Sequence, residues 1–252
     1  MIHVPENGGD DMTAEKTVLI LGASGGIGLA CADLFAENGW TCAVHAFRHT
    51  EALQTWIESH PGSLLLQGDL TLPSAAKQIV SRCEYHLGHI DSIVFCAGTA
   101  ESKPFTLLTD DDFRHMYDLH VIAPVRIIRA AFDDLVQQKG SVVLFSSMWG
   151  QIGASCESHY AAAKGAVLAL TKSLAKEFSP YGIRVNCVSP GLIDTPMNQM
   201  YSSDDLREII DHTPAGRIGI AREAASCALF LCSPDASYMN GQILSPNGGY
   251  IL

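Results

Sequence analysis

The fold class is decided by the segment Thr17-Val-Leu-Ile-Leu-Gly22-Ala-Ser-Gly-Gly26-Ile-Gly28, which continues into the helical run Leu29–Glu37. A short apolar run, typical of a buried strand, leads through a glycine-rich turn directly into a helix. Such a turn lets backbone N–H groups approach a pyrophosphate at the positive N-terminus of the helix. Glycines alone are a weak signal, because any tight turn uses them. This strand-turn-helix context nevertheless favours a dinucleotide site, although the spacing Gly-x-x-x-Gly-x-Gly is one residue longer than the commoner fingerprint.

Further apolar runs alternate with helical segments along the rest of the chain. The expected strands are Thr17–Leu21, Thr41–Ala46, Ser63–Leu66, Ser92–Ala97, Ser141–Ser146, Arg184–Ser189 and Gln242–Leu244. Their hydrophobicity is mostly continuous rather than alternating, which is typical of strands buried on both faces. The helical segments between them imply right-handed β-α-β crossovers. We therefore expect an α/β fold: a single doubly wound Rossmann-type domain with a seven-stranded parallel sheet and a ligand at the C-terminal ends of the strands.

This predicted dinucleotide-binding catalytic domain spans residues 16–252, without a Pro/Gly/Ser-rich linker or an internal repeat. Residues 1–15 are acidic and lack the apolar core of a signal peptide, so we interpret them as a disordered tail, with Met12 as an alternative start. No apolar stretch reaches the ~20 residues of a membrane span. The sequence thus predicts a cytoplasmic protein without a membrane segment.

Charge and cysteine content exclude other classes of function. The net charge of -11 argues against nucleic acid, whose binding needs clustered Lys and Arg. The eight cysteines form no Cys-x-x-Cys pair and are expected to be reduced thiols. His86-x-x-His89 has no further ligand nearby in the sequence, so no metal site is expected.

Proton-transfer chemistry is indicated by Ser147, Tyr160 and Lys164. Tyr160 and Lys164 lie four residues apart in a strongly helical run and therefore share one helix face. A cation this close to a phenol favours the phenolate and lowers the phenol pKa. Ser147 follows an apolar strand, where its hydroxyl can face a ligand crevice. The three residues predict a proton-transfer site next to a hydride donor.

These motifs together resemble the short-chain dehydrogenases/reductases, in their compact single-domain branch, from Lys16 to the C-terminus. The chain is most similar in character to 3-oxoacyl thioester reductases. The resemblance rests on motifs that occur in the family's order, namely Gly22/Gly26/Gly28, Asp69, Cys96-Ala97-Gly98, Ser147/Tyr160/Lys164, Pro190-Gly191-x-x-x-Thr195, Asn240-Gly241-Gln242 and Asn247-Gly248-Gly249. Several independent motifs in order are far more specific than any one of them.

The resemblance implies a role for each matching residue. Tyr160 is the general acid in carbonyl reduction and the base in alcohol oxidation, Lys164 lowers its pKa and holds the nicotinamide ribose, and Ser147 hydrogen-bonds the substrate oxygen. For Asp69 the resemblance implies an adenine contact, but Gly68-Asp69 is also good turn chemistry. The implied cofactor-binding residues are Gly22, Ser24, Gly25, Gly26, Ile27, Gly28, Arg48, Asp69, Leu70, Ala97, Gly98, Tyr160, Lys164, Pro190, Gly191, Ile193 and Thr195.

Three positions depart from the family pattern. His120 stands where relatives have an Asn whose helix kink holds a water of the proton relay. We include His120 among the catalytic candidates, because its carbonyl or imidazole can relay protons; the alternative is a structural substitute with impaired turnover. Phe95-Cys96 replaces the common Asn-Asn, and Leu21 replaces Thr, so side-chain hydrogen bonds that brace the strands are lost.

The end of the second strand favours NADP(H) over NAD(H). Enzymes that use NAD usually place an acid there to accept from the ribose 2′-hydroxyl. Here Ala46 is followed by Phe47-Arg48-His49, so no carboxylate repels a 2′-phosphate and Arg48 can pair with it. The alternative for Arg48 is a solvated cation.

The substrate is a small-molecule carbonyl or alcohol whose identity stays open among a free ketone, a polyketide, a CoA thioester and a carrier-protein thioester. The expected reaction is hydride transfer between nicotinamide and this group. The alternative is a weakly catalytic, cofactor-binding partner subunit or sensor, motivated by His120 and Phe95-Cys96. Relatives usually form homotetramers or homodimers by pairing helices around His115–Phe132 and Tyr160–Phe178.

Overall fold

A computed structural model describes residues 16–252, apart from the side chains of residues 199 and 200. The acidic segment 1–15 and its expected disorder lie outside the described residues.

The core of the protein is a seven-stranded sheet of order β3-β2-β1-β4-β5-β6-β9, in which all neighbours are parallel. The strands are β1 Thr17–Leu21, β2 Thr41–Ala46, β3 Leu64–Gln67, β4 Ser92–Phe95, β5 Ser141–Phe145, β6 Arg184–Val188 and β9 Ile243–Leu244. The predicted Rossmann-type sheet is confirmed. Its strand order reverses between β1 and β4, and the crevice at such a switch point is where ligands bind.

Several strands end one or two residues earlier than the sequence predicts. Cys96 and Ser146, expected within strands, instead follow β4 and β5. Each still donates its N–H to one neighbouring strand, Cys96 to Leu21 at 2.9 Å and Ser146 to Val188 at 2.8 Å. Beyond the end of β4 and of β5, the chain therefore keeps a hydrogen bond to one neighbouring strand only. The residues that follow are free to form the site.

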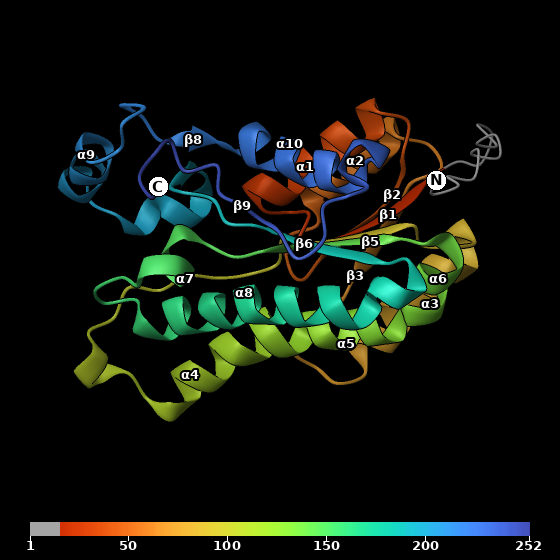
Figure 1. Cartoon of the computed structure of the whole chain (residues 1–252), viewed down its shortest axis with the longest axis horizontal. Helices are drawn as coiled ribbons and strands as arrows, with labels where there is room; N and C mark the ends of the chain where they lie inside the picture. The colour runs from red at the N-terminus through yellow and green to blue at the C-terminus, as the bar shows by residue number, and fades with distance from the viewer. Residues whose placement is uncertain (1–15) are drawn as a thin grey trace, which may run out of the picture.

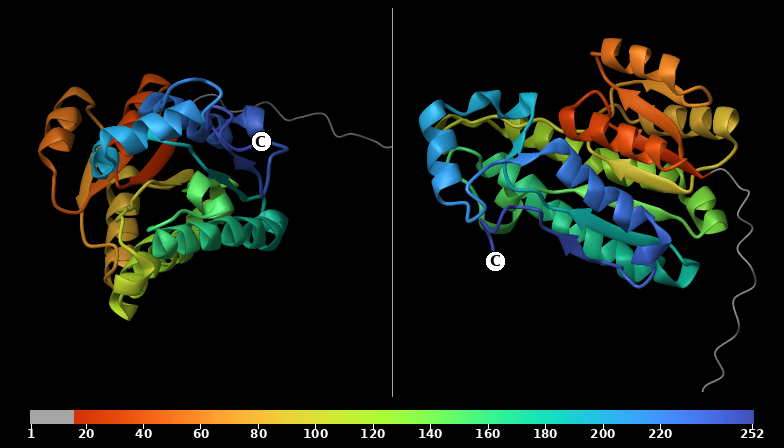
Figure 2. Two further views of the ribbon diagram at one scale, coloured as in Figure 1. Left: turned by 90° about the vertical axis from the view of Figure 1, so that its left-hand side faces the viewer. Right: turned by 90° about the horizontal axis from the view of Figure 1, so that it is seen from above.

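Helices cover both faces of the sheet (Figure 1). Because successive strand residues point to opposite faces, Val18 and Ile20 pack with α1, α2 and α10, whereas Leu19 and Leu21 pack with α3, α5 and α8. In the view from above, α10 lies alongside α1 (Figure 2). The helices are α1 Gly26–Glu37, α2 Glu51–Ser59, α3 Ala75–Leu87, α4 Asp110–Tyr117, α5 Ala123–Ala130, α6 Phe132–Gln138, α7 Met148–Ile152, α8 Ser158–Phe178, α9 Ser203–Asp211 and α10 Ala221–Cys232. Within residues 16–252, none of them combines the length and apolar character of a membrane span.

Shorter elements surround the C-terminal ends of the strands. The strands β7 Ile193–Asp194 and β8 Gly219–Ile220 pair in parallel as a separate two-stranded sheet. The 3-10 helix η4 Pro196–Met200 follows β7 and leads to α9. Helices α7 and α9 lie at the same end of the molecule (Figure 1, left). The remaining short helices are η1 Phe105–Leu107, η2 Asp118–Ile122, η3 Ser179–Tyr181 and η5 Pro234–Ala236.

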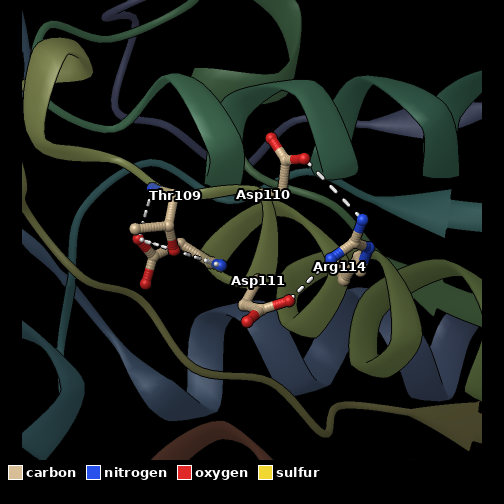
Figure 3. Close-up of polar contacts among 5 residues, drawn as sticks. Thr109, Asp110, Asp111 and Arg114 are labelled. Carbon is tan, nitrogen blue, oxygen red and sulfur yellow. Dashed lines mark hydrogen bonds and ion pairs between the residues drawn. The ribbon is translucent and has the colours of Figure 1, made fainter.

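Helix α4 begins at a capping box. The Thr109 hydroxyl accepts from the Asp112 N–H at 3.3 Å, and the Asp112 carboxylate accepts from the Thr109 N–H at 2.7 Å. Asp112 also pairs with Lys103 at 2.7 Å, while Arg114 lies between two further carboxylates of the first turn (Figure 3). Helix α4 then continues into η2, a π-helix.

Candidate active site

Ser147, Tyr160 and Lys164 line one cavity at the C-terminal ends of the strands. Ser147 follows β5, while Tyr160 and Lys164 lie on the first turns of α8. Two contacts hold these segments together. The hydroxyl of Ser146, between β5 and α7, donates to the Lys164 carbonyl at 2.8 Å, and α7 packs on α8 so closely that a Cβ at Gly150 would lie 2.7 Å from the Lys164 carbonyl carbon. The other lining residues are Ile27, Cys96, Gly98, Ala100, Phe145, Ser146, Met148, Trp149, Glu157, Pro190, Gly191, Leu192, Ile193, Thr195, Met197, Asn198 and Tyr201.

Ser147 is the N-cap of α7, and this fixes the orientation of its hydroxyl. Its backbone is extended, and Oγ accepts from the N–H of Trp149 at 3.2 Å. Because Oγ makes this bond as an acceptor, its hydroxyl hydrogen is available to donate into the cavity.

Lys164 is buried and held by the backbone of β5. Its side chain is 6% exposed, and Nζ donates to the Phe145 carbonyl at 2.8 Å. Nζ lies 5.5 Å from the centroid of the Tyr160 ring. Burial lowers the pKa of Lys164 to about 8, since a low-dielectric environment disfavours the ammonium.

Tyr160 is 7% exposed, and burial raises its pKa above the usual value. A hydrogen bond with Ser147 acts in the opposite direction, and the charge of Glu157 raises the pKa further. The shift is therefore opposite to the lowering expected from the Tyr-Lys spacing, because desolvation of the phenolate outweighs the hydrogen bond with Ser147. Tyr160 thus holds its proton at neutral pH.

His120 lies in the π-helix η2, where sequence reasoning expects a helix kink. Its Nε2 lies 2.9 Å from the Thr99 carbonyl and 3.3 Å from the Thr99 backbone nitrogen. The shorter contact assigns the proton to Nε2, and Nδ1 is buried without a partner. The ring meets Tyr160 edge-on, with centroids 5.5 Å apart. Burial, then the charge of Lys164, hold the pKa of His120 well below its usual value, so the imidazole is neutral. It also fills the space over Gly98, where a Cβ would lie 2.4 Å from Cε1.

The glycine-rich turn is packed so closely that side chains do not fit. Gly22 has a φ of +80°, and a Cβ there would lie 2.4 Å from the Cα of Ala97. A Cβ at Gly28 would lie 2.2 Å from the Gly22 carbonyl oxygen, and one at Gly26 would lie 2.7 Å from Thr195 Cγ2. The turn is thus fixed by close contacts with the residues after β4 and with the Thr195 side chain after β7.

The residues at the start of α1 fit a pyrophosphate. The N-cap Gly25 provides no side-chain cap, Ser24 is exposed, and no acidic residue occurs in the first turn. The first N–H groups of the helix therefore remain available to an anion, and the helix dipole favours one. Ile27 and Thr195 extend the same surface into the cavity.

The residues after β6 form the wall opposite α8. Met148 donates its N–H to the Pro190 carbonyl at 2.9 Å, and Gly191 donates to Pro246 at 3.1 Å. Ile193 is buried, and its carbonyl accepts from the Asn198 side chain. The structure thus brings Pro190, Gly191 and Ile193 to the cavity, as the family motif predicts.

The predicted adenosine-binding residues lie around the ends of β2 and β3. Arg48 is exposed, with its guanidinium 4.7 Å from the Phe47 ring centroid. Asp69 Oδ1 accepts from the N–H of Thr71 at 2.9 Å and from its hydroxyl at 2.6 Å, so this oxygen forms the turn that the alternative interpretation predicts. Leu70, next in the chain, is buried.

Sequence reasoning missed His45, which ties two of the binding loops together. Its Nδ1 accepts from the Gly22 N–H at 3.4 Å, and Nε2 lies 3.0 Å from the Gly68 carbonyl. Burial lowers the pKa of His45 to about 4, so the neutral ring keeps both contacts at neutral pH. The feature of the sequence that could have identified His45 is its position near the end of an apolar strand.

Glu157 was also missed, although it lies one helical turn before Tyr160. It is the N-cap residue of α8 and lines the cavity. Its Oε1 accepts from the Tyr201 hydroxyl at 2.7 Å, and that hydroxyl accepts from Trp149 Nε1 at 3.1 Å. Burial raises the pKa of Glu157, whereas the bond from Tyr201 lowers it. In the described part of the chain, no three His, Cys, Asp or Glu side chains are grouped to hold a metal ion.

Comparison with known proteins identifies the family. The family model described as "Enoyl-(Acyl carrier protein) reductase" matches residues 22–251. A relative described as an uncharacterized oxidoreductase of Bacillus subtilis (strain 168) is 38% identical over 244 residues, covering 93% of this chain and 98% of the relative. The 3-oxoacyl-[acyl-carrier-protein] reductase of Vibrio harveyi is 33% identical over 242 residues, with 94% and 98% covered.

A solved structure agrees with these sequence matches. The crystal structure of a short-chain dehydrogenase/reductase, described as a glucose/ribitol dehydrogenase, from Brucella melitensis is 32% identical. It aligns with a TM-score of 0.89 over 94% of this chain and 97% of that chain. The chain therefore belongs to the short-chain dehydrogenase/reductase family and is an NAD(P)-dependent oxidoreductase.

Proposed function

We propose that this member of the short-chain dehydrogenase/reductase family uses NADPH to reduce a ketone or a 3-oxoacyl thioester to the secondary alcohol. The observation that carries the proposal is the convergence of Ser147, Tyr160 and Lys164 on one cavity, beside the glycine-rich start of α1. The 3-oxoacyl reductases among the relatives support the substrate class. The raised pKa of Tyr160 supports the reductive direction, because the phenol then holds the proton that the product alcohol requires.

Each residue then has a separate part in the reaction. A nicotinamide held by these residues would supply the hydride for the carbonyl carbon. The Ser147 hydroxyl donates a hydrogen bond to the carbonyl oxygen, and Tyr160 transfers its proton to that oxygen as negative charge develops. Lys164, with a pKa of about 8, holds the ribose and stabilises the phenolate that remains.

His120 is proposed to take part in returning the proton to Tyr160. Its neutral ring lies edge-on to Tyr160 and has a free acceptor at Nδ1. The low pKa of His120 argues against a charged imidazolium as the relay, so the neutral ring or the backbone carbonyl would carry the proton. The alternative is that His120 replaces the family asparagine structurally and slows turnover.

NADP(H) is proposed as the cofactor on the basis of the second strand. Arg48 is exposed at its end, and residues 46–49 contain no carboxylate. Gly22, Ser24, Gly25, Gly26, Ile27 and Gly28 would hold the pyrophosphate, while Asp69, Leu70, Ala97 and Gly98 would hold the adenosine and Pro190, Gly191, Ile193 and Thr195 the nicotinamide.

A cytoplasmic homotetramer or homodimer is the proposed assembly. All eight cysteines are free, which supports a reducing compartment. On the faces expected to pair, Ile128 and Val167 are buried in the core, whereas Leu170 and Leu174 are only half-buried. Light scattering that gives a monomer mass would remove this proposal.

The reaction is tested by NADPH absorbance decay with a panel of ketones and the acetoacetyl thioester of N-acetylcysteamine. We expect turnover that Tyr160→Phe reduces by a factor of about 10² to 10⁴, while NADPH still binds. If no substrate gives turnover that depends on Tyr160, and the cofactor binds, the chain is instead a cofactor-binding partner subunit or sensor. That alternative is motivated by His120 and by Phe95-Cys96 in place of the usual asparagines.

A further inference from the structure

Glu157 lines the cavity and carries an ionisable carboxyl group, but it has no part in the proposed reaction. Among the described residues that line the cavity, only Glu157 and Lys164 are charged. The Lys164 ammonium is bound to the Phe145 carbonyl, and no ion pair joins Glu157 to a cation in residues 16–252. The Glu157 carboxylate is 3% exposed. A buried carboxylate without a counter-ion is costly and requires an explanation.

The two oxygens of this carboxylate differ. Oε1 accepts from the Tyr201 hydroxyl at 2.7 Å, whereas Oε2 is buried and has no hydrogen-bond partner. The Tyr201 hydroxyl cannot serve both oxygens, because it has one hydrogen, and its lone pair already accepts from Trp149 at 3.1 Å. Two side chains from two other segments, Tyr201 directly and Trp149 through Tyr201, thus hold the carboxylate in place and leave one oxygen without a donor.

The free oxygen belongs to a residue close to the reacting centre. Glu157 precedes Tyr160 by three residues, so the two side chains lie on the same side of the first turn of α8. The charge of Glu157 is one cause of the raised pKa of Tyr160. The same cavity is also lined by Ala100, Met148 and Met197, which offer no hydrogen-bond donor from their side chains.

We propose that the substrate carries a hydrogen-bond donor, a hydroxyl or a protonated amine, next to the reacting carbonyl, and that this donor binds Glu157. The inference rests on the proposed function and narrows its substrate class. A ketone whose neighbouring carbon carries such a group completes the hydrogen bonds of the carboxylate. A ketone that carries a methyl ether leaves the oxygen without a donor, and a keto acid places a second negative charge beside it.

The test compares three small ketones that differ at one group: hydroxyacetone, methoxyacetone and pyruvate. With wild-type protein and NADPH we expect kcat/KM for hydroxyacetone to exceed that for methoxyacetone by at least about tenfold, and that for pyruvate by more. Glu157→Gln keeps the size of the side chain and removes the charge. In this variant we expect the ratio of kcat/KM for hydroxyacetone to kcat/KM for pyruvate to fall by at least about tenfold.

Tyr201→Phe is the matched variant that separates substrate binding from a structural contact. It removes the hydroxyl that binds Oε1 and leaves the carboxylate of Glu157 intact. If Glu157 binds the substrate, Tyr201→Phe retains the preference for hydroxyacetone, whereas Glu157→Gln lowers the discrimination between hydroxyacetone and pyruvate. Equal changes in both variants would mean that Glu157 only holds Tyr201, and the inference would be wrong. Glu208→Gln, in the exposed part of α9, controls for a change of net charge.

Binding to Tyr160→Phe tests the inference independently of turnover. With NADPH present, calorimetry should give hydroxyacetone a Kd at least about tenfold below that of methoxyacetone, and Glu157→Gln in this background should reduce the discrimination against pyruvate. Equal binding of all three ketones would overturn the inference even if the protein reduces ketones. This preference, together with no turnover of any ketone by the wild-type protein, would keep the inference and remove the proposed reaction.

Discussion

The proposed cofactor half and the proposed substrate half of the site are held together by different forces. The cofactor half is built from main chain: Gly22, Gly26 and Gly28 lie so close to Ala97, Thr195 and each other that no Cβ fits. The substrate half is built from side chains, with Trp149, Tyr201 and Glu157 joined by hydrogen bonds across three segments. Main-chain packing tolerates few changes, whereas a network of side chains can be altered one group at a time. The two halves should therefore respond differently to substitution.

The largest effect is expected in the cofactor half. Gly28→Ala places a Cβ 2.2 Å from the Gly22 carbonyl oxygen, and backbone cannot move aside cheaply. We expect a loss of about 1–3 kcal/mol in the free energy of unfolding, together with loss of NADPH binding. Thermal unfolding and calorimetry measure both. Gly25→Ala is the control for stability, because its Cβ would meet the Gly22 oxygen at 3.5 Å, an ordinary contact.

A second prediction concerns the boundary between the halves, where Gly98 lies under His120. A methyl group at Gly98 would overlap Cε1 of the imidazole, so Gly98→Ala should cost about 1–3 kcal/mol of unfolding free energy. His120→Ala opens that space. In the double variant we therefore expect the cost of Gly98→Ala to fall, and a double-mutant cycle measures the coupling. Additive effects would show that the contact does not exist in solution.

Cofactor choice gives a smaller effect, because Arg48 is exposed. Loss of its contact with a 2′-phosphate in Arg48→Ala should reduce the ratio of kcat/KM for NADPH over NADH by roughly tenfold. The rate with NADH should stay close to that of the wild type. A wild-type protein that prefers NADH would contradict the proposed cofactor.

The smallest effect is expected in the pH profile of Glu157→Gln. The charge of Glu157 raises the pKa of Tyr160, so removing this charge lowers that pKa. Reduction needs protonated Tyr160, and its rate falls as pH rises through the pKa. The basic side of the profile of kcat/KM should therefore move to lower pH, with Lys164 and Tyr201 as the other titrating neighbours. An unchanged profile, as expected for Glu208→Gln, would show that Glu157 does not act on Tyr160.

The difference between the halves also explains what the sequence could predict. Continuous apolar strands and the glycine turn depend on local pattern, so the sheet and the position of the glycine turn were predictable. Ser147, Tyr160 and Lys164 were predictable because helix spacing and a family motif place them together. Strand ends such as Phe95 were less predictable, because hydrogen bonds to one neighbour keep the next residues extended.

The remaining features depend on contacts between distant segments. The link from Tyr201 to Glu157 spans 44 residues, and nothing in either segment alone indicates it. His45 joins Gly22 to Gly68 across three strands in the same way. The direction of the Tyr160 pKa depends on burial, which the Tyr-Lys spacing does not contain.

The most direct test of the account measures both halves in one variant, Tyr160→Phe. The phenol contributes a proton to the reaction and no contact to the glycine turn, so the two halves should separate. We predict that NADPH binds with a Kd close to that of the wild type, while single-turnover reduction of a ketone that the wild type reduces slows by a factor of about 10² to 10⁴. Reduction at the wild-type rate with the cofactor bound would contradict the account.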